Sequence, residues 1–210
     1  MTRLYAIAAG VVVVVFLGGL WFVTMGGGGS DDKFAQCRGS AVAGGSAQIG
    51  GPFTLIDEDG QTVTDEDVID MPTLIYFGYA FCPDVCPLDT ARNAEAVDIL
   101  EERGIMVKPV FISVDPQRDT PELLADFTDN LHPRMLGLTG TPEQVKAASQ
   151  AYRTYFQVQE PEEGDEDYYL VDHSTFSYLS FPDEGFVEFF RRDLGPDQLA
   201  DSIQCFVEAQ

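Results

Sequence analysis

Hydrophobic positions near the start of the chain form one long run. Between Leu4 and Met25 there is no charged residue, and Val, Leu, Ala and Gly predominate. About 20 such residues are enough to cross a bilayer as a helix. A cleaved signal peptide would have an apolar region of only about 7 to 15 residues before a small-residue cleavage site. The run therefore favours an uncleaved N-terminal transmembrane helix over a signal peptide.

The rest of the chain has a different pattern. Residues 26–51 are rich in Gly, Ser and Ala, which is typical of a flexible linker. From Pro52 onward, short apolar or β-branched runs alternate with segments of helical periodicity. The strands are predicted in the two halves of 52–63 around an Asp-Gly turn, and at 73–77, 107–115, 134–140, 174–181 and 186–190. The helices are predicted at 87–104, from Thr120, from Thr141 to Phe156, and from Pro196.

These elements predict three parts: an anchor at 1–25, a linker at 26–51 and one folded domain at 52–210. Strands that alternate with helices and end in a hairpin and a helix indicate an α/β domain, with a central mixed sheet flanked by helices. A buried strand followed directly by cysteines and a helix is the thioredoxin-like arrangement. The predicted fold class is therefore thioredoxin-like α/β with an N-terminal transmembrane helix.

Charge narrows the range of partners and suggests an orientation. The formal net charge of -23, with only 12 Lys and Arg residues, excludes nucleic acid as a partner, because phosphate binding needs clustered basic side chains. Arg3 precedes the apolar run, and Asp31 and Asp32 follow it. The positive-inside tendency then places the N-terminus in the cytoplasm and the domain in the periplasm or an equivalent space.

The segment "YFGYAFCPDVCP" holds two of the four cysteines, Cys82 and Cys86. If a helix begins within it, both sulfurs lie near the helix N-terminus, where the partial positive charge lowers a thiol pKa. An inert disulfide, a redox pair and a metal clamp all fit this spacing. His173, in "YLVDHSTFSYL", is either a structural histidine or a third ligand, and spacing alone does not show that it reaches the cysteines. His132 is interpreted as a surface or locally hydrogen-bonded residue. Two thiolates and one imidazole suit Cu(I), and also Cu(II) or Zn(II) with an added ligand.

Four motifs occur together: "YFGYAFCPDVCP", "ISVDPQRDTP", "LHPRMLGLTGT" and "YLVDHSTFSYL". In order and separation they closely resemble the Sco/SenC family of membrane-anchored copper chaperones, over about Pro52 to Phe206. The resemblance implies a thioredoxin-like fold and a role in assembling the binuclear copper site of cytochrome c oxidase. The family delivers copper to that site, reduces its cysteines, or does both.

Residue by residue, the resemblance places the copper ligands, for Cu(I) or Cu(II), on Cys82, Cys86 and His173. Asp84 and Asp172 are candidates for tuning the site from outside the ligand shell. The implied partners are the copper-site subunit of the oxidase and other copper carriers or thiol reductants, with a monomeric head domain. A metallochaperone is thus expected rather than an enzyme. The alternative is a thiol-disulfide oxidoreductase that uses Cys82 and Cys86, with a peroxidase relative as a weaker third.

The remaining cysteines depart from the family pattern. Cys37 lies in the predicted linker, and Cys205 lies on the last helix, away from its apolar stripe. An exposed thiol outside the cytoplasm is prone to oxidation. We therefore hypothesise a disulfide between Cys37 and Cys205 that fastens the linker to the domain.

Overall fold

The computed structural model describes residues 2–26, 32–38, 49–161 and 168–210. Within it the chain forms two compact units, Met1–Gln36 and Cys37–Gln210. The first unit contains α1 (Thr2–Gly26), which confirms a helix at the apolar run. Side chains of α1 are described only at Tyr5 and at 10–21, where they are exposed. Among the described residues no helix is long and apolar enough to cross a membrane.

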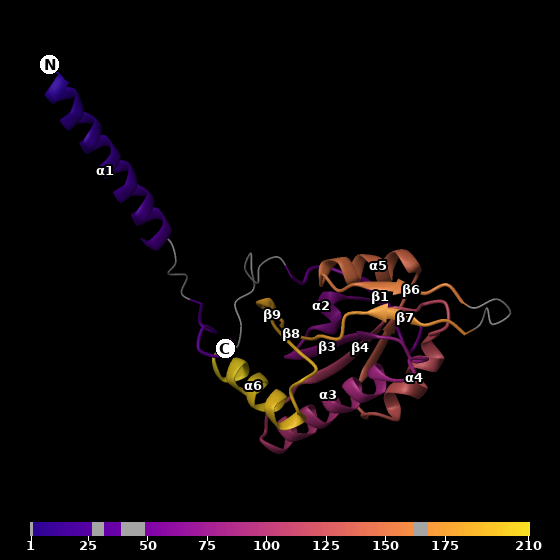
Figure 1. Cartoon of the computed structure of the whole chain (residues 1–210). Coiled ribbons are helices and arrows are strands. Elements are labelled where there is room, and N and C mark those ends of the chain that lie inside the picture. Colours follow the sequence, from indigo (N-terminus) through magenta and orange to yellow (C-terminus); the bar gives the residue numbers. More distant parts are fainter. Residues whose placement is uncertain (1, 27–31, 39–48, 162–167) are drawn as a thin grey trace. The chain divides into compact units, whose positions relative to one another are not determined.

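The second unit is built on a seven-stranded mixed sheet in the order β2-β1-β5-β4-β3-β8-β9 (Figure 1). Strands β3, β4 and β5 run parallel, and the other pairings are antiparallel. The predicted mixed sheet is therefore confirmed. The strands are β1 (Thr54–Asp57), β2 (Thr62–Thr64), β3 (Thr73–Gly78), β4 (Lys108–Ser113), β5 (Leu136–Thr139), β8 (Ser177–Phe181) and β9 (Gly185–Phe190).

Helices cover both faces of this sheet. Helices α3 and α6 lie side by side on one face, and α5 lies over the other (Figure 1). Thr120 and Thr141 cap α4 and α5 by accepting backbone N–H groups, each followed by a proline in the first turn, as their sequences predict. The helices are α2 (Asp65–Val68), α3 (Val85–Glu102), α4 (Pro121–Asp129), α5 (Pro142–Ala151) and α6 (Pro196–Glu208).

The prediction was wrong at the end of α5. This helix stops at Ala151 rather than continuing to Phe156, because Arg153 has a φ of 51°, which breaks the helical path. The chain then enters a separate two-stranded ribbon that the sequence did not predict. Its strands, β6 (Phe156–Val158) and β7 (Val171–His173), pair antiparallel. This ribbon carries the candidate ligand His173.

The core lies where β3 and β4 meet the covering helices. All six residues of β3 are buried, as predicted for a strand with helices on both sides. Tyr76 and Phe77 of this strand and Phe111 of β4 are among the largest fully buried side chains. The α3 helix adds Ala94, Val97 and Leu100. Such burial holds β3 rigidly, which matters because the cysteine loop begins where β3 ends.

Cys37 and Cys205 form a disulfide, with their Cα atoms 5.6 Å apart. Next to it, the Arg38 guanidinium donates to the Val187 carbonyl at 2.6 Å and lies 3.7 Å from Glu188. The second compact unit begins at Cys37, and the start of the folded domain at Pro52 stays a prediction. Most of the predicted linker, 27–31 and 39–48, falls outside the described residues.

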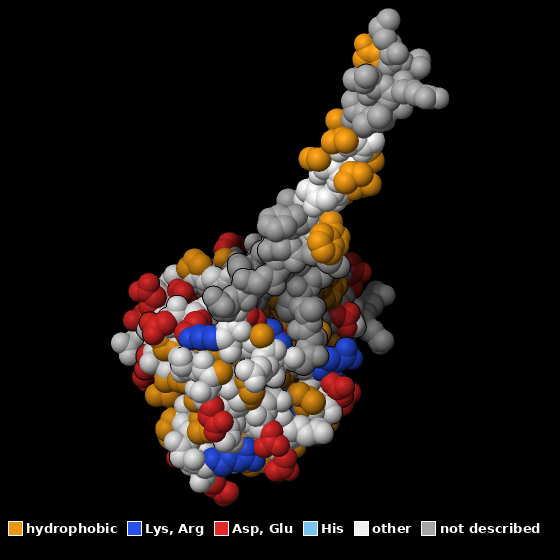
Figure 2. All heavy atoms as spheres, turned by 90° about the vertical axis from the view of Figure 1, so that its left-hand side faces the viewer, with side chains coloured by type: hydrophobic (Ala, Val, Ile, Leu, Met, Phe, Trp, Pro, Cys, Tyr) orange, Lys and Arg blue, Asp and Glu red, His pale blue; other side chains and the backbone are white. Residues whose placement is uncertain are grey.

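The acidic composition is visible on the face shown in Figure 2, where Asp and Glu side chains outnumber Lys and Arg. Several of the cations are paired: Arg103 contacts Asp201 at 2.7 Å, and Arg134 contacts Glu101 at 2.7 Å. Exposed pairs of this kind contribute little to stability. Because several of the 12 Lys and Arg side chains are paired in this way, the surface of the domain is predominantly acidic.

The disulfide joins residues 168 positions apart, so it restricts the unfolded chain strongly. We expect the Cys37→Ser/Cys205→Ser double variant to lower the free energy of unfolding by about 2 to 4 kcal/mol in urea titrations. As a control, the Cys82→Ala/Cys86→Ala variant, denatured without reductant, should show no reactive thiol. Two reactive thiols in that control would contradict the bridge.

Candidate metal centre

Sheet topology explains why distant segments meet at one edge. Strands β3 and β4 are parallel, so the loops that follow Gly78 and Ser113 leave the sheet at the same edge. Strand β8 is antiparallel to β3, with Tyr76 opposite Ser177, so the residues that precede β8 reach this edge too. The loop after β3 carries the cysteines, and the segment before β8 carries the histidine. This is the edge at which open α/β sheets place their sites.

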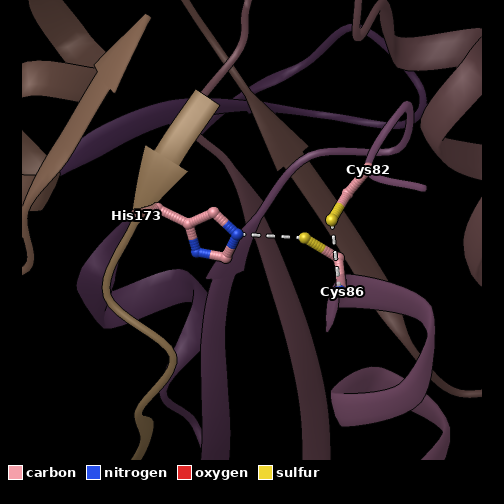
Figure 3. A group of neighbouring side chains, drawn as sticks. All are labelled: Cys82, Cys86 and His173. Atoms are coloured by element: carbon pink, nitrogen blue, oxygen red, sulfur yellow. Dashed lines mark hydrogen bonds between the residues drawn. The ribbon is translucent and has the colours of Figure 1, made fainter. Parts of the chain in front are cut away.

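The two cysteines occupy the junction between β3 and α3. Helix α3 begins at Val85, so Cys86 lies in its first turn, while Cys82 lies in the loop ahead of it rather than on the helix. The Cys86 N–H donates to the Cys82 sulfur at 3.3 Å (Figure 3). Both thiols are free of disulfides and buried, Cys86 completely and Cys82 to all but 8%.

His173 completes the group from the end of β7. Its Nε2 lies 3.1 Å from the Cys86 sulfur (Figure 3). Its Nδ1 lies 3.0 Å from the Ser174 carbonyl oxygen. A carbonyl oxygen can only accept a hydrogen bond. Nδ1 therefore carries the hydrogen and donates a hydrogen bond to the Ser174 carbonyl. Nε2 is left with its lone pair directed at the sulfur. The candidate ligand atoms of Cys82, Cys86 and His173 all lie within 4.8 Å of one another.

The electrostatics correct one prediction from the sequence. Burial raises the pKa of the Cys86 thiol, and the nearby Cys82 raises it further. Burial likewise lowers the pKa of His173. The expected lowering of the pKa of Cys86 at the helix N-terminus is therefore wrong, because the loss of hydration on burial is the largest influence on this thiol. Without metal, Cys86 is a neutral thiol beside a neutral imidazole, and a metal ion must displace the thiol proton.

Tyr76 and Asp89, which sequence reasoning missed, lie next to the candidate ligands. The Tyr76 hydroxyl donates to the Asp89 carboxylate at 3.0 Å, and its ring meets His173 edge-on at 6.2 Å. Asp89 is buried and lies 3.4 Å from the guanidinium of Arg192. Its spacing, three residues after Cys86 on a helix, was the available signal.

Gly78 allows the close approach of the strand to the sulfur. A Cβ atom at this position would lie 2.9 Å from the Tyr76 ring, 3.0 Å from the Phe111 ring and 3.2 Å from the Cys86 sulfur. Any side chain would therefore displace the sulfur or the rings. The glycine at the end of β3 is thus part of the architecture of the site.

The two predicted tuning carboxylates lie on the surface. Asp84 is exposed at the N-cap of α3 and makes no capping hydrogen bond with its side chain. Asp172 is exposed on β7 and accepts a hydrogen bond from Gln159 at 2.9 Å. Among the described residues, neither forms a hydrogen bond with a candidate ligand side chain, although the charge of Asp172 acts to raise the pKa of His173 against the larger effect of burial. The role of both carboxylates in tuning the site stays a prediction.

His132 is held by local hydrogen bonds, as predicted, but it is buried, so the alternative of a surface position is wrong. Its Nδ1 accepts the Arg134 backbone N–H at 3.1 Å, and its Nε2 lies 3.2 Å from Asp98. It could form a second group with Asp98 and Glu101, but Glu101 is already paired with Arg134. Every member of that group therefore has a partner, which favours a structural role.

Two sulfurs and one imidazole form a soft donor set. Thiolates favour Cu(I), imidazole binds both copper states, and a zinc ion would take water as a fourth ligand. The set can also form a disulfide between its two thiols, and that would remove both sulfur ligands. The geometry thus fits copper binding and thiol-disulfide chemistry.

The fold and this group of side chains define a thioredoxin-like α/β protein with a thiol and imidazole site at the sheet edge. A family model described as SCO1/SenC matches residues 41–208. The chain is 55% identical over 204 residues to Protein SenC of Rhodobacter capsulatus, covering 97% of this chain and 90% of that protein. The chain therefore belongs to the SCO1/SenC family, as the resemblance predicted.

Solved structures agree with this assignment. The crystal structure of Arabidopsis thaliana ScoI with copper bound matches with a TM-score of 0.71 and 42% identity, covering 76% of this chain and 99% of that one. BsSco, described as a member of the Sco family of cytochrome c oxidase assembly proteins and reported with a disulfide switch, matches with a TM-score of 0.59 and 25% identity. It covers 77% of this chain and 93% of that one.

A buried carboxylate, that of Asp119, contacts the loop that carries the cysteines. Asp119 Oδ2 accepts the Ala80 backbone N–H at 3.0 Å and the Ser113 hydroxyl at 2.5 Å. Burial raises the pKa of Asp119 to about 6 from an ordinary 3.8, although both hydrogen bonds act to lower it. This side chain therefore changes charge near neutral pH in the folded protein.

The raised pKa makes stability depend on pH. A carboxyl whose folded pKa exceeds its unfolded pKa stabilises the fold below about pH 4, and this contribution is lost as pH rises through 6. We expect the free energy of unfolding of the wild type, relative to Asp119→Asn, to fall by up to about 3 kcal/mol between pH 4 and pH 8. Asp183→Asn, in the exposed β8–β9 turn, should follow the wild-type profile. Parallel curves for wild type and Asp119→Asn would contradict the raised pKa.

Proposed function

We propose that this protein binds one copper ion through Cys82, Cys86 and His173 and delivers it to the binuclear copper site of cytochrome c oxidase. The observation that carries the proposal is the convergence of two free thiols and one imidazole nitrogen within 4.8 Å. The copper-bound structure of the Arabidopsis relative, at 42% identity, supports copper as the cargo. The description of BsSco as a cytochrome c oxidase assembly protein supports the destination.

The site suits transfer rather than permanent storage. Binding replaces the proton on each thiol with the metal, while the Nδ1–H bond to Ser174 keeps the His173 lone pair available. Three protein ligands leave coordination positions open on either copper state. A thiolate or imidazole of the acceptor can therefore bind the ion before the carrier's ligands release it. Copper would then pass by ligand exchange.

A second candidate function is reduction of the acceptor's cysteines. It is favoured because Cys82 and Cys86 are both free thiols and lie close to each other. Cys82, the less buried sulfur, would attack an acceptor disulfide as a thiolate to form a mixed disulfide. Cys86 would then displace the acceptor cysteine. Two electrons and two protons pass to the acceptor, and a Cys82–Cys86 disulfide forms, which a cellular thiol reductant would reduce. The disulfide switch reported for BsSco is consistent with such chemistry.

We also propose that the N-terminal segment anchors the protein, with its N-terminus in the cytoplasm and a monomeric copper-binding domain in the periplasm. The support is the uncharged run from Leu4 to Met25, which has Arg3 before it and Asp31 and Asp32 after it. The Cys37–Cys205 disulfide fits an oxidising compartment. A tethered domain would stay close to a membrane-bound oxidase.

Copper titration of the reduced full-length chain tests the first function. We expect one copper per chain and thiolate-to-copper absorption bands with Cu(II). Cys82→Ala, Cys86→Ala and His173→Ala should each abolish the bands. Each should also weaken binding by more than about 100-fold, because a ligand contributes more than the outer contacts, whose loss costs about 10- to 100-fold.

The other histidine and the other cysteines serve as matched controls. His132→Asn and Cys37→Ser/Cys205→Ser should keep one copper and the wild-type bands. His173→Ala separates the two functions, because a reductase should retain most of its dithiol exchange without this imidazole. If the wild type binds no stoichiometric copper but its dithiol exchanges rapidly, copper delivery is contradicted and reduction of the acceptor becomes the supported function.

Membrane fractionation tests the anchor. We expect the full chain to remain in the membrane pellet after carbonate extraction, and a variant lacking residues 2–26 to be soluble and still bind copper. A protease added outside the cytoplasmic membrane should degrade the domain. Release of the full chain by carbonate would contradict the proposed anchor.

A further inference from the structure

The loop between β4 and α4 contacts both segments that carry candidate ligands. Asp119 accepts the backbone N–H of Ala80, two residues before Cys82. Asp115 Oδ1 accepts the hydroxyl of Tyr169 at 2.7 Å, four residues before His173. The cysteine loop and the ribbon are far apart in sequence, and this loop links them.

Arg118 lies at the centre of these contacts. Its Nε donates to Asp115 Oδ2 at 2.5 Å, and its side chain is only 15% exposed. The guanidinium carbon lies 3.6 Å from the centre of the Tyr169 ring and 5.1 Å from that of Phe81. Tyr79 is also within range, at 5.7 Å. A guanidinium within about 6 Å of aromatic faces is attracted to them, and a planar one can stack.

Tyr79 extends these contacts to the ligands themselves. Its ring meets His173 edge-on, with centroids 5.8 Å apart and an interplanar angle of 87°. Its carbonyl accepts the Cys82 backbone N–H at 3.2 Å. The chain of contacts therefore runs from Arg118 through Tyr79 to both Cys82 and His173.

The ribbon needs such an attachment. Strand β7 has three residues, and the strand that it pairs with is β6, outside the main sheet. An isolated two-stranded ribbon is at best marginally stable in water. The backbone pairing of β6 and β7 thus does not by itself fix His173 relative to the cysteines. Val171 of β7 is buried in the core, and the contacts of Tyr169 with Arg118 and Asp115 add a polar connection between the start of β7 and the loop after β4.

We infer that Arg118 is a positioning residue, which holds the Cys82 loop and the His173 ribbon together so that the ligand atoms are in place before copper binds. This inference rests on the proposed copper function. A prearranged site avoids the cost of ordering two mobile segments at the moment of binding. Loss of Arg118 should therefore weaken copper binding while every ligand remains present.

Copper affinity provides the first test. In the reduced full-length chain, titrated with Cu(I) against a chromophoric chelator, we expect Arg118→Met to bind one copper about 10- to 100-fold more weakly than wild type. Arg118→Lys should not restore affinity, because a lysine cannot stack flat on the Tyr169 ring. The Cu(II) absorption bands should also shift. Arg103→Met, which removes an arginine paired with Asp201 at the far end of α3, should match wild type.

Hydrogen exchange of the metal-free, reduced chain provides a second test that does not depend on copper. We expect Arg118→Met to speed amide exchange at 79–82 and at 169–174 together, and Arg103→Met to leave both segments unchanged. If Arg118→Met does not fold, Tyr169→Leu serves instead, because it removes the stacked ring from a half-buried position and leaves the Arg118–Asp115 pair intact. The same paired effects are expected.

The outcomes separate this inference from the proposed function. If wild type binds copper and Arg118→Met has unchanged affinity or unchanged exchange in both segments, the positioning role is overturned and copper binding stands. If wild type binds no copper but Arg118→Met speeds exchange in both segments, the copper function fails and the positioning role stands. If Arg118→Met lowers thermal stability but its folded fraction keeps the wild-type copper affinity and absorption bands, Arg118 has an ordinary structural role and the inference is overturned.

Discussion

Tyr76 of β3 pairs with Ser177 of β8 across two antiparallel strands, while the same β3 pairs in parallel with β4. These pairings bring the end of β3, the end of β4 and the residues before β8 to one edge of the sheet. The cysteines, the Arg118 loop and the histidine ribbon are therefore neighbours, although about 90 residues separate Cys82 from His173. A sheet paired differently would keep the same residues and lose the site.

Burial determines the chemical state of this edge. The rings of Tyr76 and Tyr79 pack edge-on against the half-buried His173, and Cys86 is fully buried. Loss of hydration favours the neutral thiol and the neutral imidazole, although the helix N-terminus favours the thiolate. Cys86 and His173 are thus neutral in the metal-free protein.

The candidate ligands come from two different parts of the fold. Cys86 is rigid because it lies between the buried strand β3 and a long helix, and Gly78 admits no side chain there. His173 lies on a short ribbon outside the main sheet. Contacts of Arg118 with Tyr169 and Tyr79 connect the two, so a single side chain outside the ligand shell can govern the spacing of the ligands.

The sequence alone determined much of this protein. Continuous apolar runs identified the buried strands, Thr-Pro pairs identified the starts of α4 and α5, and four linked motifs identified the family and the three candidate ligands. These features are local, because propensity, capping and spacing act within a few residues. The β6–β7 ribbon was missed, since its strands are three residues long and only their pairing stabilises them.

Only the tertiary structure decided the rest. The rise in the pKa of Cys86 depends on burial by residues that are distant in sequence, so the helix start by itself suggested the opposite direction. The roles of Asp89 and Arg118 likewise depend on what lies opposite them in space. Sequence patterns report which residue types are present and how the nearby backbone folds. Desolvation, hydrogen-bond partners and ring contacts arise between segments, and these were decided when the sheet brought those segments together.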